Sequence, residues 1–415
     1  MRTVLFEDPL VSQLDPLALA RPAYLLSCGG TTLYGALGAI VTPVESYVRP
    51  HLRAIEDADR TLTAHGGAVP ETTLLLNGAV VPTVATIRTL NELVQLGKQC
   101  VVRNRDQIAA AVVPAGFPLP LNPTDSDGYQ LLKRALDEFN VPDEDYSIHL
   151  LRDPHDLVAE HVLNFADTLE DRIARNDFTQ LADGVFVTDP NTTIDSLIRC
   201  DTSKGPILIE ENVSIGPFTY LRGPLHIGKN AIINEHASLK DNVWVGNNAK
   251  VGGEVEESVI EPFSNKQHHG FLGHSYIGSW VNLGAGTSNS DLKNTYGQIR
   301  IDYDYGRCDT GMQFLGCMIG DYTKSAINTS IFTGKVIGAC SMLYGFITTN
   351  VPSFANYART FGQVTELPAD VLIDTQRRMF TRRRITQRPI DIQLLRDMNE
   401  LVREKRQLVE ERLAL

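Results

Sequence analysis

A six-residue repeat dominates the middle of the chain. Eight aliphatic residues follow one another at six-residue intervals, namely Ile209, Ile215, Leu221, Ile227, Ile233, Leu239, Val245 and Val251. An α-helix repeats about every 3.6 residues and a strand about every two, so neither produces this period. A parallel β-helix does, because each short strand turns a corner after six residues and stacks its aliphatic side chain inside the coil. The repeat therefore predicts a β-helix.

The repeat also shows where the coil ends and where it is interrupted. It returns at Ile277, Leu283, Ile319, Ile331, Ile337 and Leu343. We therefore expect the coil to run from about Pro206 to about Pro352. Its phase is lost between Asp291 and Gly311, which predicts a loop on one face of the scaffold.

The regions before and after the coil have different patterns. In the region before the coil, predicted strands and helices alternate, as in an α/β domain. Apolar runs and helical spacing predict strands at Thr3–Phe6, Thr73–Leu76 and Cys100–Val102, and helices over Val84–Leu96, Asp127–Phe139 and Pro154–Ile173. We therefore expect an α/β domain over residues 1–195, the β-helix over 196–360 and a basic, helical tail over 361–415.

The tail combines an arginine cluster with an apolar stripe. The cluster consists of Arg377, Arg378, Arg382, Arg383, Arg384 and Arg388. The stripe consists of Leu394, Leu395, Met398, Leu401, Val402, Leu408 and Val409, which share one face of a long helix. The stripe predicts packing on a neighbouring surface. The arginines are either solvated or bind an anion, such as a coenzyme A phosphate or an acidic partner surface.

Composition excludes several classes of function. The net charge of −12 argues against nucleic-acid binding, and no apolar window approaches the length of a transmembrane span. The six cysteines are scattered without CxxC pairs, which indicates neither a zinc ribbon nor a disulfide framework. We expect a cytoplasmic protein that binds neither nucleic acid nor membranes.

Two runs in the coil carry a family resemblance. They are Ile-Gly-Pro-Phe-Thr-Tyr-Leu-Arg from Ile215 and Asn-Leu-Gly-Ala-Gly-Thr from Asn282. They resemble the left-handed β-helix of the bifunctional enzymes that acetylate glucosamine-1-phosphate and uridylylate the product. The resemblance is closer to a related group of sugar nucleotidyltransferases, whose pattern is similar to Gly252–Val255, Ser264–Lys266, Gly270–Gly273 and Thr349–Phe354 here.

The resemblance implies an acetyl-transfer site on the coil, with acetyl-CoA as co-substrate. The family carries a catalytic His five residues before the Gly of its Leu-Gly turn, which corresponds to His268. Neutral imidazole suits the task of taking a proton from an attacking amine near pH 7. Asn282 matches an Asn that can donate to a carbonyl oxygen. Arg222 matches a phosphate-binding Arg, and Lys266, two residues before His268, is a second candidate for phosphate.

The acceptor side departs from the family pattern. The Asn-Tyr pair expected after Gly-Ala-Gly-Thr is absent, and Asn289 and Lys293 are the candidates to replace its sugar contacts. The Tyr expected three residues after the catalytic His is Phe271. The family resemblance also implies a homotrimer, because acetyl-CoA sites in such acyltransferases form between adjacent coils. The acceptor sugar and the acyl chain are left open.

The N-terminal region is similar to sugar nucleotidyltransferases in its strand-and-loop pattern. Its candidate nucleotide-binding residues are Arg21, Gly29, Gly30, Asn77 and Gly78. The family Asp that binds Mg²⁺ corresponds to Ala79, which cannot ligate a metal. If this domain makes a UDP-N-acetylglucosamine-type product it needs Mg²⁺, for which Asp8 or Asp183 could substitute. The nucleotide and the turnover of this domain are left open.

Two alternatives compete with the acetyltransferase interpretation. The altered acceptor loop and the Ala at position 79 are also consistent with a non-catalytic sugar-nucleotide-binding or scaffold protein. The γ-class carbonic anhydrases are left-handed β-helix trimers that bind zinc through three histidines, and His236, His269 and His274 have a comparable spacing. Our main prediction contains no resident metal on the coil.

Overall fold

The structure is a computed structural model that describes residues 1–120 and 124–406. The chain forms two compact units. The first comprises Met1–Asp153 and Arg388–Leu394, and the second comprises Pro154–Gln387 and Leu395–Leu415. Within the described residues, no helix is both long and apolar enough to cross a membrane.

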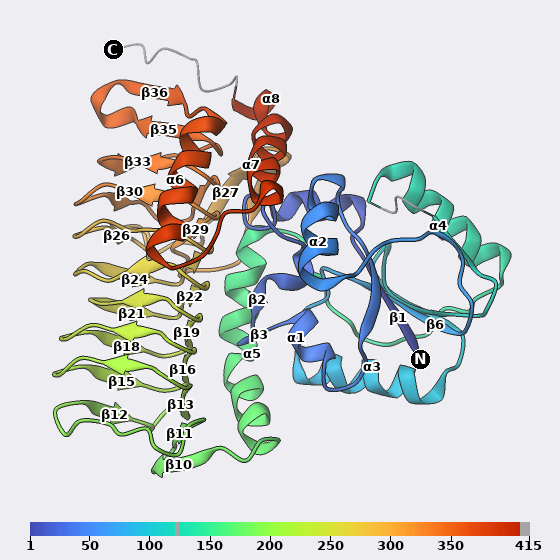
Figure 1. Ribbon diagram of the computed structural model, residues 1–415, viewed down its shortest axis with the longest axis horizontal. Helices are drawn as coiled ribbons and strands as arrows, with labels where there is room; N and C mark the ends of the chain where they lie inside the picture. The colour runs from blue at the N-terminus through green and yellow to red at the C-terminus, as the bar shows by residue number, and fades with distance from the viewer. Residues whose placement is uncertain (121–123, 407–415) are drawn as a thin grey trace. The chain divides into compact units, whose positions relative to one another are not determined.

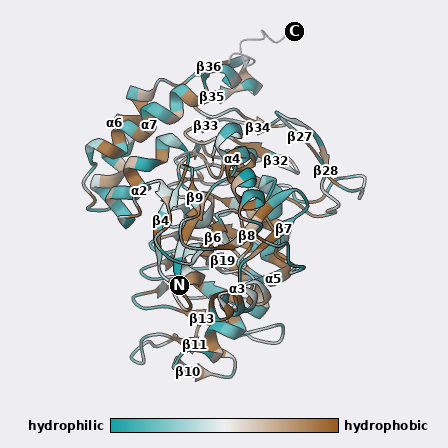
Figure 2. Ribbon diagram, turned by 90° about the vertical axis from the view of Figure 1, so that its right-hand side faces the viewer, coloured by the Kyte–Doolittle hydropathy of each residue, from teal (hydrophilic) through white to brown (hydrophobic). Residues whose placement is uncertain are grey.

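The first unit is an α/β domain built on a mixed five-stranded sheet in the order β4-β1-β6-β8-β7. Strands β4, β1 and β6 are parallel, and β8 and β7 are antiparallel to their neighbours. Every residue of β6 and β8 is buried, as their apolar sequences TLLLN and QIAAAVV predict, and both strands are hydrophobic in Figure 2. The elements are β1 (Arg2–Phe6), β2 (Ser27–Cys28), β3 (Thr31–Thr32), α1 (Leu33–Leu37), β4 (Pro43–Tyr47), α2 (Arg53–Arg60), β5 (Gly67–Ala68), β6 (Thr73–Asn77), α3 (Val84–Leu96), β7 (Cys100–Asn104), β8 (Gln107–Val113), β9 (Pro118–Leu119) and α4 (Ser126–Glu138).

The second unit is the predicted parallel β-helix, whose stacked strands are visible in Figure 1. Its first sheet contains β10 (Thr179–Ala182), β11 (Val185–Val187), β13 (Ile207–Ile209), β16 (Leu225–Ile227), β19 (Val243–Val245), β22 (Val259–Ile260), β25 (Tyr276–Ile277), β29 (Cys317–Ile319) and β32 (Lys335–Ile337). The aliphatic residues of the repeat stack in register inside the coil and form one continuous core. The period of six thus predicted both the fold and its core.

Two further faces complete the coil. The second face contains β14 (Ser214–Ile215), β17 (Ile232–Ile233), β20 (Lys250–Val251), β23 (Asn265–Lys266), β30 (Lys324–Ser325), β33 (Met342–Leu343), β35 (Ala355–Ala358) and β36 (Gln363–Glu366). Asn282 bridges β23 to β30. The third face contains β12 (Arg199–Asp201), β15 (Tyr220–Arg222), β18 (Ser238–Lys240), β21 (Glu254–Glu256), β24 (Phe271–Gly273), β26 (Ser288–Asn289), β31 (Ser330–Ile331) and β34 (Phe346–Ile347). The segment that loses the repeat contains a hairpin of β27 (Arg300–Tyr303) and β28 (Gly306–Asp309).

Two helices of the second unit pack along the coil (Figure 1). Helix α5 (Pro154–Ala174) is attached through His161, whose Nε2 lies 2.8 Å from the carbonyl oxygen of Asn242. Helix α6 (Ala369–Arg382) covers a corner where Phe263, Trp280 and Tyr322 all adopt positive φ. We call these three residues the aromatic column. The rings of Phe263 and Trp280 stack at 4.4 Å.

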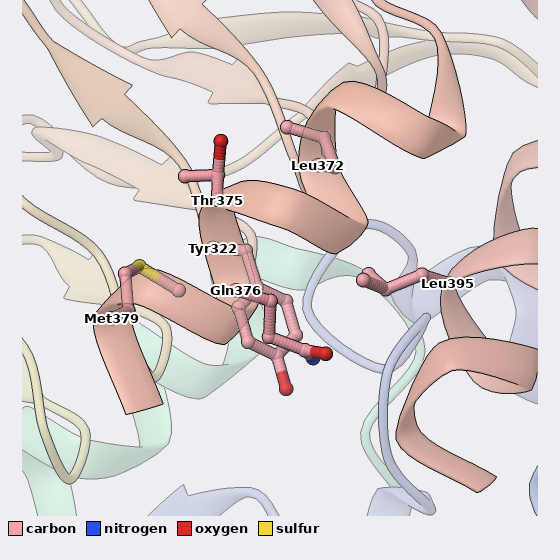
Figure 3. Close-up of a pocket in the computed structure, with 6 residues that line it drawn as sticks. All are labelled: Tyr322, Leu372, Thr375, Gln376, Met379 and Leu395. Carbon is pink, nitrogen blue, oxygen red and sulfur yellow. The ribbon is translucent and has the colours of Figure 1, made fainter. Parts of the chain in front are cut away.

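Helix α6 contacts the aromatic column along its length. Phe380 of α6 packs against Trp280 with ring centroids 4.7 Å apart. Farther along the helix, a small pocket forms where Tyr322 meets α6 and the second part of α7 (Pro389–Leu401). Figure 3 shows its lining by Tyr322, Leu372, Thr375, Gln376, Met379 and Leu395. These contacts determine where the arginines at the end of α6 lie.

The apolar stripe of the tail is buried at four of its predicted positions. These are Leu394, Leu395, Met398 and Val402, whereas Leu401 is 55% exposed. The prediction was wrong at Leu401 because α7 ends there, and the short helix α8 (Arg403–Arg406) follows instead of a continuous helix. Leu408 and Val409 lie outside the described residues.

Candidate functional site

The predicted catalytic histidine lies on a short loop between two faces of the coil. His268 follows β23 and precedes β24, and its side chain is exposed, as is that of His269. Gly270 closes the loop with φ of 126°, and a Cβ there would lie 2.1 Å from the carbonyl oxygen of Thr287. Only glycine fits this close approach. The loop is therefore held tightly against the next coil while the imidazole of His268 faces solvent.

Lys266 occupies an inward position of the coil rather than a surface position. It stacks in register on Val251, and only 2% of the residue is exposed. Its Nζ donates to the carbonyl oxygen of His268 at 2.6 Å and to that of Gly252 at 2.8 Å. Burial lowers the pKa of Lys266 to about 8. The ammonium group thus fastens the His268 loop from inside the coil.

Asn282 belongs to a relay of side-chain hydrogen bonds that begins in α6. Arg383, at the end of α6, donates from Nη2 to Oδ1 of Asn265 at 2.8 Å. Asn265 donates from Nδ2 to Oδ1 of Asn282 at 3.2 Å. A guanidinium group can only donate, so it determines which way both amides face. Within the described residues Nδ2 of Asn282 has no hydrogen-bond partner, so it can donate to a ligand.

Arg222 lies at a different corner of the coil and already has an anionic partner. Its guanidinium group donates to both carboxylate oxygens of Asp241, at 2.7 and 2.6 Å. Lys204 donates to the same carboxylate at 3.0 Å. Hydrogen bonding to Asp241 raises the pKa of Arg222. The structure does not bring Arg222 together with His268, although the sequence placed both in one site.

The two residues proposed to replace the missing sugar contacts have protein partners. Asn289 is 6% exposed and pairs with the backbone of Gly273, accepting from its N–H and donating to its carbonyl oxygen, both at 3.0 Å. The Asn289 amide thus makes the two hydrogen bonds to Gly273 that the backbone of a neighbouring strand would otherwise make. Nζ of Lys293 donates to the carbonyl oxygen of Gln298 at 2.7 Å, within the inserted segment.

The histidines considered for zinc do not converge in one place within the described residues. His236 stacks on Phe218 at 5.3 Å, and His274 pairs through Nδ1 with Asp291 at 2.9 Å. His269 is exposed on the catalytic loop. None of the three belongs to a group of three metal-ligating side chains in the part of the chain that the structure describes.

The carboxyl ends of the parallel strands in the first unit carry a second group of polar residues. The chain leaves β1 toward β4 on one side and later reaches β6 on the other, which makes the end of β1 the topological switch point. Ligands of open α/β sheets bind at such points. Asn77 ends β6 here and Gly78 follows it, and the N–H of Gly78 donates to the carbonyl oxygen of Phe6 at 2.7 Å. A Cβ at Gly78 would lie 3.1 Å from the ring of Tyr24.

The remaining nucleotide-binding candidates lie in two turns of the first unit. Gly29 and Gly30, with φ of 58° and 84°, form the two-residue turn between β2 and β3. Positive φ at both positions is typical of a type I′ hairpin. The geometry of the turn is therefore enough to explain why both residues are glycine. The carbonyl oxygen of Arg21 accepts from Arg49 at 3.0 Å, and Arg49 also pairs with the buried carboxylate of Glu7. Sequence reasoning missed this buried pair.

The expected metal-ligand position and its candidate substitute Asp8 are both buried in the first unit. Ala79 occupies the position of the expected metal ligand and is itself buried. Asp8 is 1% exposed, and its oxygens accept from Leu10, from Asn77 at 3.0 Å and from Gln107 at 2.7 Å. Three of the roughly four lone-pair sites of this carboxylate are thus used within the protein. Asp183 belongs to the second unit, in the turn between β10 and β11.

The first part of the chain is similar to one known protein family. Residues 3–170 match the model of a family described as sugar nucleotidyl transferase. The N-terminal region is similar to sugar nucleotidyl transferases. This agrees with the resemblance found in its strand-and-loop pattern.

Three individual proteins give the scale of the similarity. A bifunctional sugar-1-phosphate nucleotidylyltransferase/acetyltransferase of Sulfurisphaera tokodaii is 36% identical over 143 residues, which cover 34% of this chain and 36% of that protein. The bifunctional protein GlmU of Thermotoga petrophila is 27% identical over 150 residues, 36% of this chain and 26% of that protein. The structure of a UDP-N-acetylglucosamine acyltransferase of Francisella novicida covers 51% of this chain and 76% of its own, at 17% identity and a TM-score of 0.23, too low to support an argument. The matches span about a third of the curated relatives or less.

Proposed function

We propose that the second unit transfers an acetyl group from acetyl-CoA to the amine of an amino-sugar phosphate. The observation that carries this proposal is the loop of His268, which is exposed, fastened by Lys266 and adjacent to the Asn265–Asn282 pair. A base and a directed amide donor on one rigid scaffold are the groups that amine acylation requires. The relatives that combine nucleotidylyltransferase and acetyltransferase in one chain support the same conclusion.

The proposed reaction assigns one role to each group. The imidazole of His268 takes a proton as the amine nitrogen attacks the thioester carbonyl carbon, and the new C–N bond forms. Nδ2 of Asn282 donates to the carbonyl oxygen, where negative charge develops. The C–S bond then breaks, and the departing thiolate of CoA receives the proton from the imidazolium. Lys266 acts indirectly, by holding the carbonyl oxygen of His268.

The phosphate-binding roles of Arg222 and Lys266 and the sugar contacts of Asn289 and Lys293 stay predictions. Each of these side chains has a protein partner, so ligand binding would require an exchange of partners. A cytoplasmic homotrimer is part of the proposal, because the acyltransferases that the coil resembles complete their acetyl-CoA sites between neighbouring coils. The free thiols at all six cysteines are consistent with a reducing compartment.

For the first unit, the binding of a sugar nucleotide without turnover is favoured by two observations. Ala79 replaces the metal ligand, and the buried Asp8 already accepts three hydrogen bonds from the protein. Nucleotidyl transfer with Mg²⁺ is the alternative for this unit.

The experiment that tests acetyl transfer measures CoA release from acetyl-CoA with a panel of amino-sugar phosphates. His268→Ala is compared with His269→Ala, which removes an exposed imidazole from the neighbouring position of the same loop. Loss of a general base lowers the rate by about a hundredfold or more. We expect that loss in His268→Ala and near wild-type rates in His269→Ala. Equal rates in all three proteins would contradict the role of His268, and no release by the wild type with any acceptor would contradict acetyl transfer.

A further inference from the structure

The C-terminal end of α6 carries arginines that differ from the others in the tail. Arginines elsewhere in α6, α7 and α8 face carboxylates, namely Arg377 and Arg378 with Asp374, Arg396 with Asp370, and Arg403 with Glu400. Among the residues that the structure describes, the side chains of Arg382 and Arg384 have no hydrogen bond or ion pair, and the side chain of Arg383 bonds only to the neutral amide of Asn265. The unpaired arginines are thus confined to one place.

Lys250 of the coil joins this cluster. It is the register neighbour of Asn265, which Arg383 contacts, and its own side chain has no partner in the described part of the chain. Arg382 is the chain neighbour of Arg383. Burial and the charges of Arg383 and Arg382 lower the pKa of Lys250. Burial and Arg382 likewise lower the pKa of Arg383. We call Lys250, Arg382 and Arg383 the cation cluster.

The cation cluster needs an explanation because it is unfavourable by itself. The C-terminus of a helix attracts cations, but its dipole amounts to about half an elementary charge, which cannot balance three. The chain as a whole has a net charge of −12, yet none of its carboxylates pairs with the cluster in the described residues. An anion bound from solution would supply the missing charge.

The position of the cluster indicates what kind of anion it binds. Lys250, Asn265 and Asn282 follow one another in register on the second face of the coil. Neighbouring strands lie about 4.8 Å apart, so Lys250 is about 10 Å from Asn282. A phosphorylated substrate whose reacting group lies at Asn282 can reach the cluster with its phosphate. Two guanidinium groups and an ammonium group suit a phosphate monoester dianion.

We propose that Lys250, Arg382 and Arg383 form a binding site for the phosphate monoester of a substrate of the second unit. The site is completed when α6 packs on the aromatic column, because this contact brings Arg382 and Arg383 to the coil. The same chemistry could come from the 3′-phosphate of coenzyme A or from the phosphate of an amino sugar. The proposal rests on the proposed acetyl transfer for the identity of the substrates.

Calorimetry with matched pairs of probes tests the site without turnover. One pair is CoA and 3′-dephospho-CoA, and the other is glucosamine-1-phosphate and glucosamine. The wild type should bind the phosphorylated member of one pair on the order of tenfold or more tightly, because each charge-assisted hydrogen bond strengthens binding by about that factor. The pair that shows the preference identifies the source of the phosphate.

Two variants separate the cluster from its surroundings. Lys250→Gln leaves the bond between Arg383 and Asn265 intact, and the double substitution Arg382→Gln, Arg383→Gln removes the helix contribution. Both should abolish the preference for the phosphorylated probe. The double substitution Arg377→Gln, Arg378→Gln removes the same charge from the same helix at arginines that pair with Asp374, and it should leave the preference unchanged.

The outcomes distinguish this site from the proposed function. The absence of a preference in the wild type, or a preference that survives in both cluster variants, would overturn the site. A preference that requires the cluster in a wild-type protein that releases no CoA would retain the site and overturn acetyl transfer. CoA release that is indifferent to all these substitutions would retain acetyl transfer and overturn the site.

Discussion

At the scale of single residues, partners decide which charged side chains are available to a ligand. Arg222 and Lys266 both match phosphate-binding expectations in the sequence, yet Arg222 pairs with Asp241 and Lys266 points into the coil. The side chains of Arg382, which the sequence offered only as one of six tail arginines, and of Lys250, which it did not single out, lack partners within the described residues. Whether a charged side chain is free to bind a ligand depends on neighbours that are distant in sequence. A sequence motif by itself therefore does not predict it.

Lys266 makes a testable contribution to stability. Its pKa of about 8 in the folded state lies below the ordinary 10.5, so the folded protein releases this proton first as the pH rises. The free energy of unfolding should therefore increase between pH 8 and 10.5, by on the order of 3 kcal/mol from this group. Lys266→Met keeps a linear side chain, one atom shorter and without a titrating group, and should lose this increase. Chemical denaturation of both proteins across that range measures it, and identical pH dependence would show that Lys266 is not buried as described.

At the scale of elements, the packing of α5 on the coil depends on a neutral histidine. Nε2 of His161 bonds to the carbonyl oxygen of Asn242, and its ring stacks on Phe165 at 4.8 Å. Its buried Nδ1 has no partner in the part of the chain that the structure describes. Burial lowers the pKa of His161 to about 4. Protonation would place a buried N–H donor and a charge at Nδ1, where the described residues offer no acceptor. The packing of α5 on the coil is therefore more stable when His161 is neutral.

Acid should therefore loosen α5. The stability that His161 provides is complete above its unfolded pKa of 6.5 and is lost as the pH falls toward 4, with about 2 kcal/mol gone by pH 5. His161→Gln retains a donor and does not titrate, so it should lose less stability on acidification than the wild type. Thermal unfolding at pH 7.5 and 5 compares the two proteins. A variant as acid-sensitive as the wild type would assign the effect to other groups.

At the scale of the whole molecule, the proposed acetyl transfer implies an assembly. The resemblance to trimeric acyltransferases predicts a particle of three 45.8 kDa chains, since neighbouring coils would complete the acetyl-CoA site. Light scattering coupled to size exclusion measures this mass directly. A monomer that still releases CoA would show that one chain contains the entire site, and a monomer without activity would weaken the acyltransferase assignment.

Sequence reasoning was strongest where a property is local and repeats. The β-helix core followed from the six-residue period, and helix Val84–Leu96 of the first unit was predicted to the residue. The candidate site was harder to predict, because the acceptor side lacks the family motif. Asn289 shows why: a polar residue in the expected loop turned inward to bond Gly273, a choice that depends on the geometry of the adjacent coil.

The sequence by itself determined the coil and the interruption that carries the β27–β28 hairpin. These depend on spacing between residues that are near one another in the chain. Only the tertiary structure decided the relay from Arg383 through Asn265 to Asn282 and the cluster that shares it, because Arg383 and Asn265 are 118 positions apart. Such contacts arise when α6 buries its apolar face on the aromatic column. Burial of that face brings the arginines at the end of α6 to the coil. Their position there cannot be predicted from a local sequence pattern.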